Sequence, residues 1–249
     1  GRFFRENGQL TGKVAEYARD VFFTVGTWPV MDRGVRQRAA TISSRNMAAV
    51  GLTSTTDAFG SLESLVAYQD ARETDELFFR LSFMPGGNSE VYEGLKLAGI
   101  RSGFGDDILR IGAVKFSADG SASERTMYMS TPFEGTDDHG ILTMSQEEIN
   151  AAVDEAVAHG FRVGIHANGD VTIDMVLRAY ERVLRSASGV NPRHRIEHCS
   201  LINEDLLRRI KAAGVVPAPF YTYAHYHGNK WVDYGAEKME FMFAHRSFL

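Results

Sequence analysis

FRVGIHANGDVTIDMVLRAYERVLRSASGVNPRHRIEHCS, residues 161–200, is the stretch of the chain that decides the fold. It holds two short β-rich runs, Phe161–His166 and His194–Cys199, with a helical pattern between them. A strand, a helix and a second strand in this order are typical of a parallel sheet with helices packed outside it. The stretch therefore predicts an α/β fold.

The same alternation extends in both directions from this stretch. Six strands are predicted in all, at residues 52–56, 79–84, 111–116, 161–166, 194–199 and 215–220. Ser145 and Glu148 have the spacing of a capping box, and Gly160 follows the helix that they predict. Asn203 and Gly214 bracket another helix in the same way. A closed barrel and an open sheet both fit this order of elements.

Composition favours small-molecule chemistry. The 249 residues carry a formal net charge of -5 with the two signs interspersed, which excludes a basic surface for nucleic acid or an anionic membrane. No apolar run is long enough to span a bilayer. The one cysteine, Cys199, cannot form an internal disulfide, so a reducing, cytoplasmic location is expected. Strand alternation turns Cys199 away from His198 and predicts a buried, inert thiol.

Two segments do not fit the alternating pattern. We interpret residues 1–32, which are rich in turn-forming residues, as part of an insertion or accessory segment, and residues 126–140 as a long loop over the strand ends. Residues 33–249 then form the main domain. The chain starts at Gly1, and residues 237–249 have an amphipathic helical pattern without a terminating glycine, so we expect an internal piece of a longer protein.

Polar residues stand where several predicted strands end, which is where parallel α/β folds place their catalytic groups. A lone histidine at such a position is usually a structural hydrogen-bonding group. Here His166 and His198 end consecutive strands, which favours a shared site. Lys115 lies on an apolar strand, where burial is costly without a partner. It is either an ion-paired or snorkelling lysine, a Schiff-base lysine, or a carbamylated metal ligand.

Four motifs resemble the amidohydrolase superfamily, and in particular its YtcJ-like family 3 branch: KFSADGSASERT (115–126), HANGD (166–170), NPRHRIEHCS (191–200) and GLTSTTDA (51–58). The resemblance extends to YHGNKW (226–231) and MFAHRSFL (242–249). It implies a (β/α)8 barrel of the TIM type, incomplete here, with about six of eight strands and the first and last missing. It also implies a metal-dependent hydrolase of carbon–nitrogen bonds in amides, formamides or cyclic amides.

Residue by residue, the resemblance implies that Lys115 is a carboxylated lysine bridging two divalent metal ions, expected to be zinc, and that His166 and His198 are metal ligands. The family also has a His-x-His pair on its first strand and a general-base aspartate on its eighth. Neither is present here, and the aspartate is expected beyond the C-terminus. The pair His225 and His227 has the right spacing, but it follows the last predicted strand and is not assigned as a ligand.

Several further residues have two interpretations each. Arg125 binds a substrate carboxylate or pairs with Asp119 or Glu124. Asp119 and Asp170 support the metal ligands from behind, or Asp170 caps the next helix. Tyr226 and Trp231 line a substrate pocket or pack a loop. Asp57 is predicted to cap the helix that starts near Ser61.

Two other functions stay open at this point. One is a metal-free aldolase-type barrel in which Lys115 forms a Schiff base with a carbonyl substrate. The other is a catalytically inactive fragment. In either case a small molecule is the expected partner, and the two unpaired sheet edges of an incomplete barrel permit homo-oligomers.

Overall fold

The computed structural model describes residues 1–186 and 191–249, and it divides into two compact units. Unit 1 consists of Gly1–Trp28, Ser117–Val153 and Ile165–Leu249. Unit 2 consists of Pro29–Phe116 and Asp154–Gly164. The predicted division of the chain at residue 32 stays a prediction.

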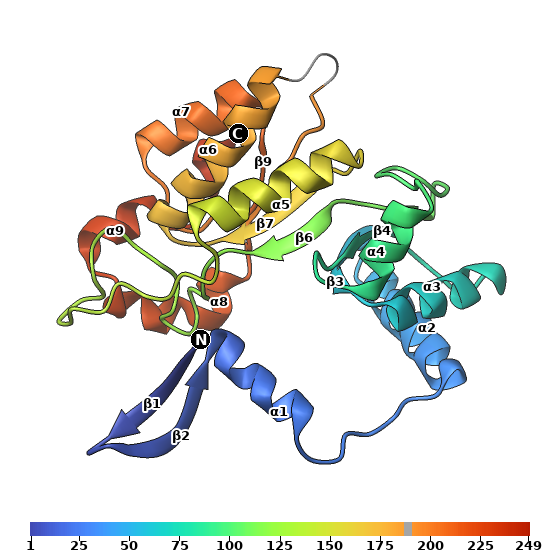
Figure 1. The fold of residues 1–249 in the computed structure, drawn as a ribbon, viewed down its shortest axis with the longest axis horizontal. Coiled ribbons are helices and arrows are strands. Elements are labelled where there is room, and N and C mark those ends of the chain that lie inside the picture. The colour runs from blue at the N-terminus through green and yellow to red at the C-terminus, as the bar shows by residue number, and fades with distance from the viewer. Residues whose placement is uncertain (187–190) are drawn as a thin grey trace. The chain divides into compact units, whose positions relative to one another are not determined.

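Unit 2 contains a three-stranded parallel sheet with the order β3-β4-β5. Leu81 of β4 pairs with Thr55 of β3 and with Leu109 of β5. Helices α2 and α3 lie side by side next to this sheet and enclose a small apolar core with it (Figure 1). The elements of unit 2, in chain order, are α2 (Arg33–Ala49), β3 (Ser54–Gly60), α3 (Leu62–Glu73), β4 (Arg80–Pro85), α4 (Glu90–Leu97) and β5 (Leu109–Ile111).

Unit 1 starts with an antiparallel hairpin, β1 (Arg2–Glu6) and β2 (Gln9–Ala15), followed by the short helices η1 (Glu16–Asp20) and α1 (Val21–Thr24). A four-stranded sheet has the order β6-β7-β8-β9, and β8 and β9 are parallel. The strands of this sheet and the helices between them are β6 (Val114–Ser117), α5 (Gln146–Ala158), β7 (Val163–Ala167), α6 (Asp170–Ser186), β8 (Arg195–His198), α7 (Glu204–Ala213) and β9 (Val216–Ala218). The residues of β6 up to Phe116, of α5 from Asp154 and of β7 up to Gly164 belong to unit 2. Short helices follow: α8 (Tyr223–His227), η2 (Gly228–Asp233), α9 (Ala236–Phe241) and η3 (His245–Phe248).

The predicted helix signals act as expected. The Ser145 hydroxyl accepts from the Glu148 amide at 3.2 Å, and the Glu148 carboxylate accepts from the Ser145 amide at 2.7 Å. Asn203 accepts from the Leu206 amide at 2.9 Å, and Gly214 ends α7 with a φ of 62°.

The parallel strand pairs and the helices between them confirm the prediction of a mixed α/β fold with parallel sheets. Among the described residues, no helix combines the length and the apolar character needed to cross a membrane.

Three local predictions were wrong or incomplete. Residues 2–15 form a hairpin because Asn7 and Gly8, with φ of 49° and 80°, make the two-residue turn that favours one, a signal that the sequence carries plainly. The strand predicted at residues 111–116 is divided, because the Gly112 amide donates to the Phe83 carbonyl at 2.6 Å. The C-terminal helix ends at Phe241, because the Phe243 amide donates to the Ser200 carbonyl at 2.8 Å.

Asp57 does not cap helix α3, because Ser61 fills that role by accepting from the Ser64 amide at 3.3 Å. Burial raises the pKa of the Asp57 carboxyl above its ordinary value, although a hydrogen bond with the Tyr68 hydroxyl lowers it in part. A carboxyl whose folded-state pKa is raised binds its proton more tightly in the folded chain. Its contribution to stability is therefore complete below the unfolded pKa and is lost as the pH rises through the folded pKa.

We therefore expect Asp57→Asn to raise the melting temperature at about pH 7 and to lose this advantage at about pH 3, where both side chains are neutral. Thermal unfolding followed by circular dichroism at both pH values measures the effect. The exposed Asp107 of the same unit provides the control, since Asp107→Asn should not change the melting temperature. A wild-type chain more stable than Asp57→Asn at neutral pH would contradict the prediction.

Candidate metal-binding site

The two strand-end histidines lie next to each other in unit 1. His166 is near the end of β7 and His198 ends β8, and their ring centroids are 4.4 Å apart with the rings nearly perpendicular. Both side chains are half-buried. The structure therefore brings together two of the three residues for which the sequence predicted a metal-binding role.

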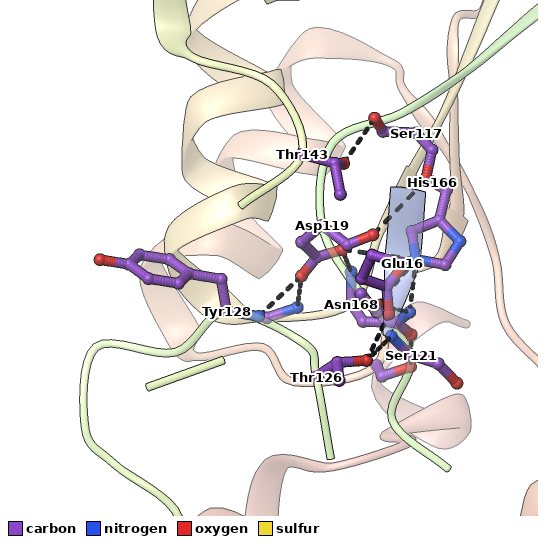
Figure 2. A network of polar contacts seen from close by, with 12 residues as sticks. Glu16, Ser117, Asp119, Ser121, Thr126, Tyr128, Thr143, His166 and Asn168 are labelled. Carbon is purple, nitrogen blue, oxygen red and sulfur yellow. Dashed lines mark hydrogen bonds and ion pairs between the residues drawn. The ribbon is translucent and has the colours of Figure 1, made fainter. Parts of the chain in front are cut away.

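Asp119 organises the backbone behind His166. Its side chain is fully buried, and its two oxygens accept from the amides of Asn168 at 3.0 Å, Gly169 at 2.9 Å and Tyr128 at 3.0 Å (Figure 2). Burial raises the pKa of this carboxyl to about 7, while the backbone donors lower it. Asp119 thus joins the turn after β7 to the loop at residues 120–128.

The carbonyl of Gly120 sets the orientation of the His166 ring. It lies 2.8 Å from His166 Nε2 and 2.9 Å from Asn168 Nδ2. A carbonyl oxygen only accepts, and Asp119 Oδ1 lies 3.4 Å from the same nitrogen, so these two acceptors favour a proton on Nε2 and the lone pair on Nδ1. Asn168 Nδ2, a donor 2.9 Å away, is the one neighbour that opposes this tautomer. Histidines that bind metals usually donate their other ring N–H to a carbonyl or carboxylate in this way.

His198 stands at a strained position of the backbone. Its φ is 71°, that of Cys199 is 47°, and the Cys199 amide donates to the Glu197 carbonyl at 3.0 Å. A bond between residues two apart around a positive φ near this value is the rare form of the γ-turn. Conformations of this kind cluster at functional sites, where the surrounding structure maintains them.

Aromatic side chains continue from His198. The Phe220 ring lies edge-on to it with centroids 4.5 Å apart, and Tyr223 stacks on Phe220 at 5.3 Å. Trp231 stacks on Phe243 at 5.6 Å within an apolar cluster, whereas Tyr226 is 70% exposed. A role for Tyr226 or Trp231 in substrate binding stays a prediction.

The other candidate residues have structural partners. Arg125 lies 3.6 Å from the carboxylate of Asp233 and over the Phe133 ring. Within the described part of the chain its ion pair is therefore with Asp233, and not with Asp119 or Glu124 as expected. Asp170 accepts from the Ser130 amide at 2.9 Å at the start of α6. Cys199 is fully buried, and burial raises the pKa of its thiol, which agrees with the predicted inert side chain.

Lys115 belongs to unit 2, in the part of β6 that ends at Phe116. It is 3% exposed, its Nζ donates to the Phe116 carbonyl at 3.1 Å, and it lies 5.1 Å from the centroid of the Phe59 ring. The lysine is buried as the apolar strand implied. Its role as a carboxylated ligand stays a prediction.

The donor chemistry at the histidine pair suits a transition metal, because neutral imidazole is a common ligand of zinc. Within residues 1–186 and 191–249, no group of three or more His, Cys, Asp or Glu side chains is arranged to hold a metal ion.

Sequence reasoning missed the groups that hold His166. Asn168 and Ser200 are polar residues that each stand two positions after a candidate ligand, just beyond the ends of β7 and β8. That spacing was a signal in the sequence. The carbonyl of Gly120 gave none, because any residue supplies a carbonyl.

The site thus consists of two imidazoles at adjacent strand ends of an α/β fold. The sequence matches the amidohydrolase family over residues 1–247, and the chain belongs to that family.

Curated relatives share short segments with the chain. Over 103 residues it is 28% identical to the putative amidohydrolase YtcJ of Bacillus subtilis (strain 168), which covers 41% of the chain and 19% of that protein. Over 91 residues it is 33% identical to the protein LONG AFTER FAR-RED 3 of Arabidopsis thaliana, covering 36% of the chain and 16% of that protein.

Two solved structures have the same fold over 93% of the chain, and both are described as uncharacterized metal-dependent hydrolases. That from Pyrococcus horikoshii OT3 has a TM-score of 0.78 at 24% identity, and that from Pyrococcus furiosus has 0.80 at 22%. The chain spans 45% and 48% of their lengths, respectively. It thus corresponds to less than half of these proteins.

Proposed function

We propose that this chain is part of a metal-dependent hydrolase of non-peptide carbon–nitrogen bonds, in amides, formamides or cyclic amides, built on a (β/α)8 barrel. The observation that carries the proposal is the pair His166 and His198, with rings 4.4 Å apart at adjacent strand ends and His166 held by a backbone carbonyl. Family membership supports hydrolysis, and the metal-dependent hydrolases with the same fold support a divalent ion.

His166 and His198 would hold the metal, which we propose to be zinc. We further propose that two zinc ions bind and that a carboxylated Lys115 would be a ligand of both. When bound, such a metal activates water at neutral pH and polarises the scissile carbonyl group. His166 would present Nδ1, because Nε2 donates to Gly120. Asp119 does not act as the general base, because its oxygens accept three backbone N–H groups and its side chain is fully buried. It holds the loop that carries Gly120.

The first test is zinc binding by the purified chain, measured by competition with a chromogenic chelator. We expect His166→Ala and His198→Ala each to weaken zinc binding by at least about 100-fold, since even residues behind the ligands change metal affinity 10–100-fold. The control is His139→Ala, which removes a half-buried histidine of unit 1 that bonds to the Met129 carbonyl at 2.9 Å. This variant should retain wild-type affinity.

The second test is hydrolysis of N-formyl and N-acyl amines and cyclic amides by the zinc-loaded chain, with release of amine or carboxylate as the readout. The same assay on a chain extended at both ends tests whether further residues are required. A chain that binds no zinc, or whose zinc binding does not depend on the two histidines, would refute the proposed site. Trapping of a carbonyl substrate on Lys115 by borohydride would establish the Schiff-base alternative instead.

A further inference from the structure

We infer that Asn168 and Ser200 are positioning residues that fix the tautomer of His166 and couple it to the strand that carries His198. The inference concerns the residues behind the histidine pair. Its consequence for metal binding rests on the proposed function, whereas its consequence for the tautomer does not.

The orientation of the Asn168 amide follows from its two neighbours. The Ser200 hydroxyl donates to Asn168 Oδ1, and Asn168 Nδ2 donates to the Gly120 carbonyl at 2.9 Å. Turning the amide over would bring Oδ1 against the carbonyl oxygen, so that two acceptors would face each other. Asn168 is 1% exposed and Ser200 is fully buried, so water does not readily replace either bond.

The same arrangement decides which ring nitrogen of His166 carries the proton. Asn168 Nδ2 and His166 Nε2 are 2.9 Å apart, and both lie within hydrogen-bond distance of Gly120 O. If Nε2 had no proton, its lone pair would face the lone pairs of that oxygen at 2.8 Å. A carbonyl has two lone pairs and accepts both N–H groups, and Asp119 Oδ1 is a second acceptor 3.4 Å from Nε2. The Nε2–H form therefore satisfies both acceptors, and its cost is that Asn168 Nδ2 and His166 Nε2 become neighbouring donors 2.9 Å apart.

We call the hydrogen-bonded group of Ser200, Asn168 and the Gly120 carbonyl the clamp, and it connects the ends of the two strands. Asn168 follows His166 by two residues and Ser200 follows His198 by two, and the Leu201 amide donates to the Asn168 carbonyl at 2.8 Å. The Ser200–Asn168 bond therefore joins the ends of β7 and β8 directly beyond the two histidines. Without the Ser200–Asn168 bond, the Asn168 amide is no longer fixed in orientation. The Gly120 carbonyl then loses the N–H that holds it, and the His166 ring loses its fixed acceptor.

The decisive experiment is nitrogen NMR of the metal-free chain with 15N-labelled histidine, at a pH where the imidazoles are neutral. Protonated and unprotonated ring nitrogens have well-separated chemical shifts, so each histidine reports its own tautomer. We expect His166 to be Nε2–H and His139 to be Nδ1–H in the same spectrum, because His139 presents Nδ1 to the Met129 carbonyl at 2.9 Å. A wild-type His166 in the Nδ1–H form would overturn the inference without any variant.

The variants test the positioning role itself. Asn168→Ala and Ser200→Ala should each give a mixture of His166 tautomers and about 10–100-fold weaker zinc binding. Ser200→Thr retains the hydroxyl and should therefore keep the single tautomer and the zinc affinity of the wild type. The control is Ser102→Ala in unit 2, which removes a serine hydroxyl that bonds to the Gly112 carbonyl and the Arg162 amide, outside the unit that contains the histidine pair. It should leave the His166 tautomer unchanged.

The outcomes separate this inference from the proposed function. Zinc binding that depends on both histidines, with a single Nε2–H tautomer retained in Asn168→Ala, would refute the clamp and leave the function in place. A tautomer that responds to Asn168 and Ser200 in a chain that binds no zinc would support the clamp and refute the function.

Discussion

Replacing Asp119 by asparagine is expected to lower the free energy of unfolding by about 3 kcal/mol, because a buried N–H without an acceptor costs about 1–3 kcal/mol. One carboxylate oxygen accepts from the Asn168 amide, and the other accepts from the amides of Gly169 and Tyr128. Asparagine offers one oxygen and one NH2 group in the same space, so its NH2 group must face at least one of these buried donors. The change is isosteric, so cavity formation does not contribute.

Urea denaturation followed by tryptophan fluorescence measures this effect, since Trp28 and Trp231 are the only tryptophans of the chain and both belong to unit 1. The control is Asp137→Asn, the same change at an exposed carboxylate of the same unit, and its free energy of unfolding should match that of the wild type. Equal stabilities of Asp119→Asn and the wild type would show that Asp119 does not secure this backbone.

Replacing Gly169 by alanine is expected to have a comparable effect for a different reason. A Cβ atom at residue 169 would lie 1.8 Å from the Tyr128 carbonyl oxygen and 2.4 Å from its carbon, and both are backbone atoms that cannot rotate away. Overpacking of this kind typically costs about 1–3 kcal/mol, and we expect a value near the upper end, about 3 kcal/mol. The N–H that donates to Asp119 is retained, so the loss is steric.

Gly94 provides the matched comparison. It lies in helix α4, and a Cβ atom there would meet no atom within 4 Å. Gly94→Ala should therefore raise the free energy of unfolding by up to about 1 kcal/mol through helix propensity. Since Asp119 and Gly169 both contact Tyr128, the double variant should cost less than the sum of the single ones. Strict additivity would mean that the two substitutions act on separate contacts.

The elements with local signals could be predicted from the sequence. The Ser145–Glu148 capping box and the Asn203 cap depend on residues three positions apart, so the sequence shows both partners at once. The order of strands and helices between β7 and β9 follows from the same local patterns. The hairpin at residues 2–15 was equally local, and its Asn7–Gly8 turn was overlooked.

The site was predictable only in part, because its remaining contacts join distant residues. His166 and His198 could be found as residues that end consecutive strands. The acceptor of the His166 proton is the backbone oxygen of Gly120, 46 residues away in sequence, and a backbone oxygen has no sequence signature. The break of the C-terminal helix at Phe241 likewise depends on pairing between Phe243 and Ser200. Such contacts are settled by tertiary packing.

The boundaries of the two units constrain how the chain can be dissected. Helix α5 starts in unit 1 and ends in unit 2, since the boundary falls after Val153, and strand β7 crosses back after Gly164. No single cleavage of the chain yields either unit as one continuous polypeptide. Deleting one unit would also leave the other with a truncated helix and strand. For protein engineering, the two units are therefore best treated as one piece, to be exchanged or fused only as a whole.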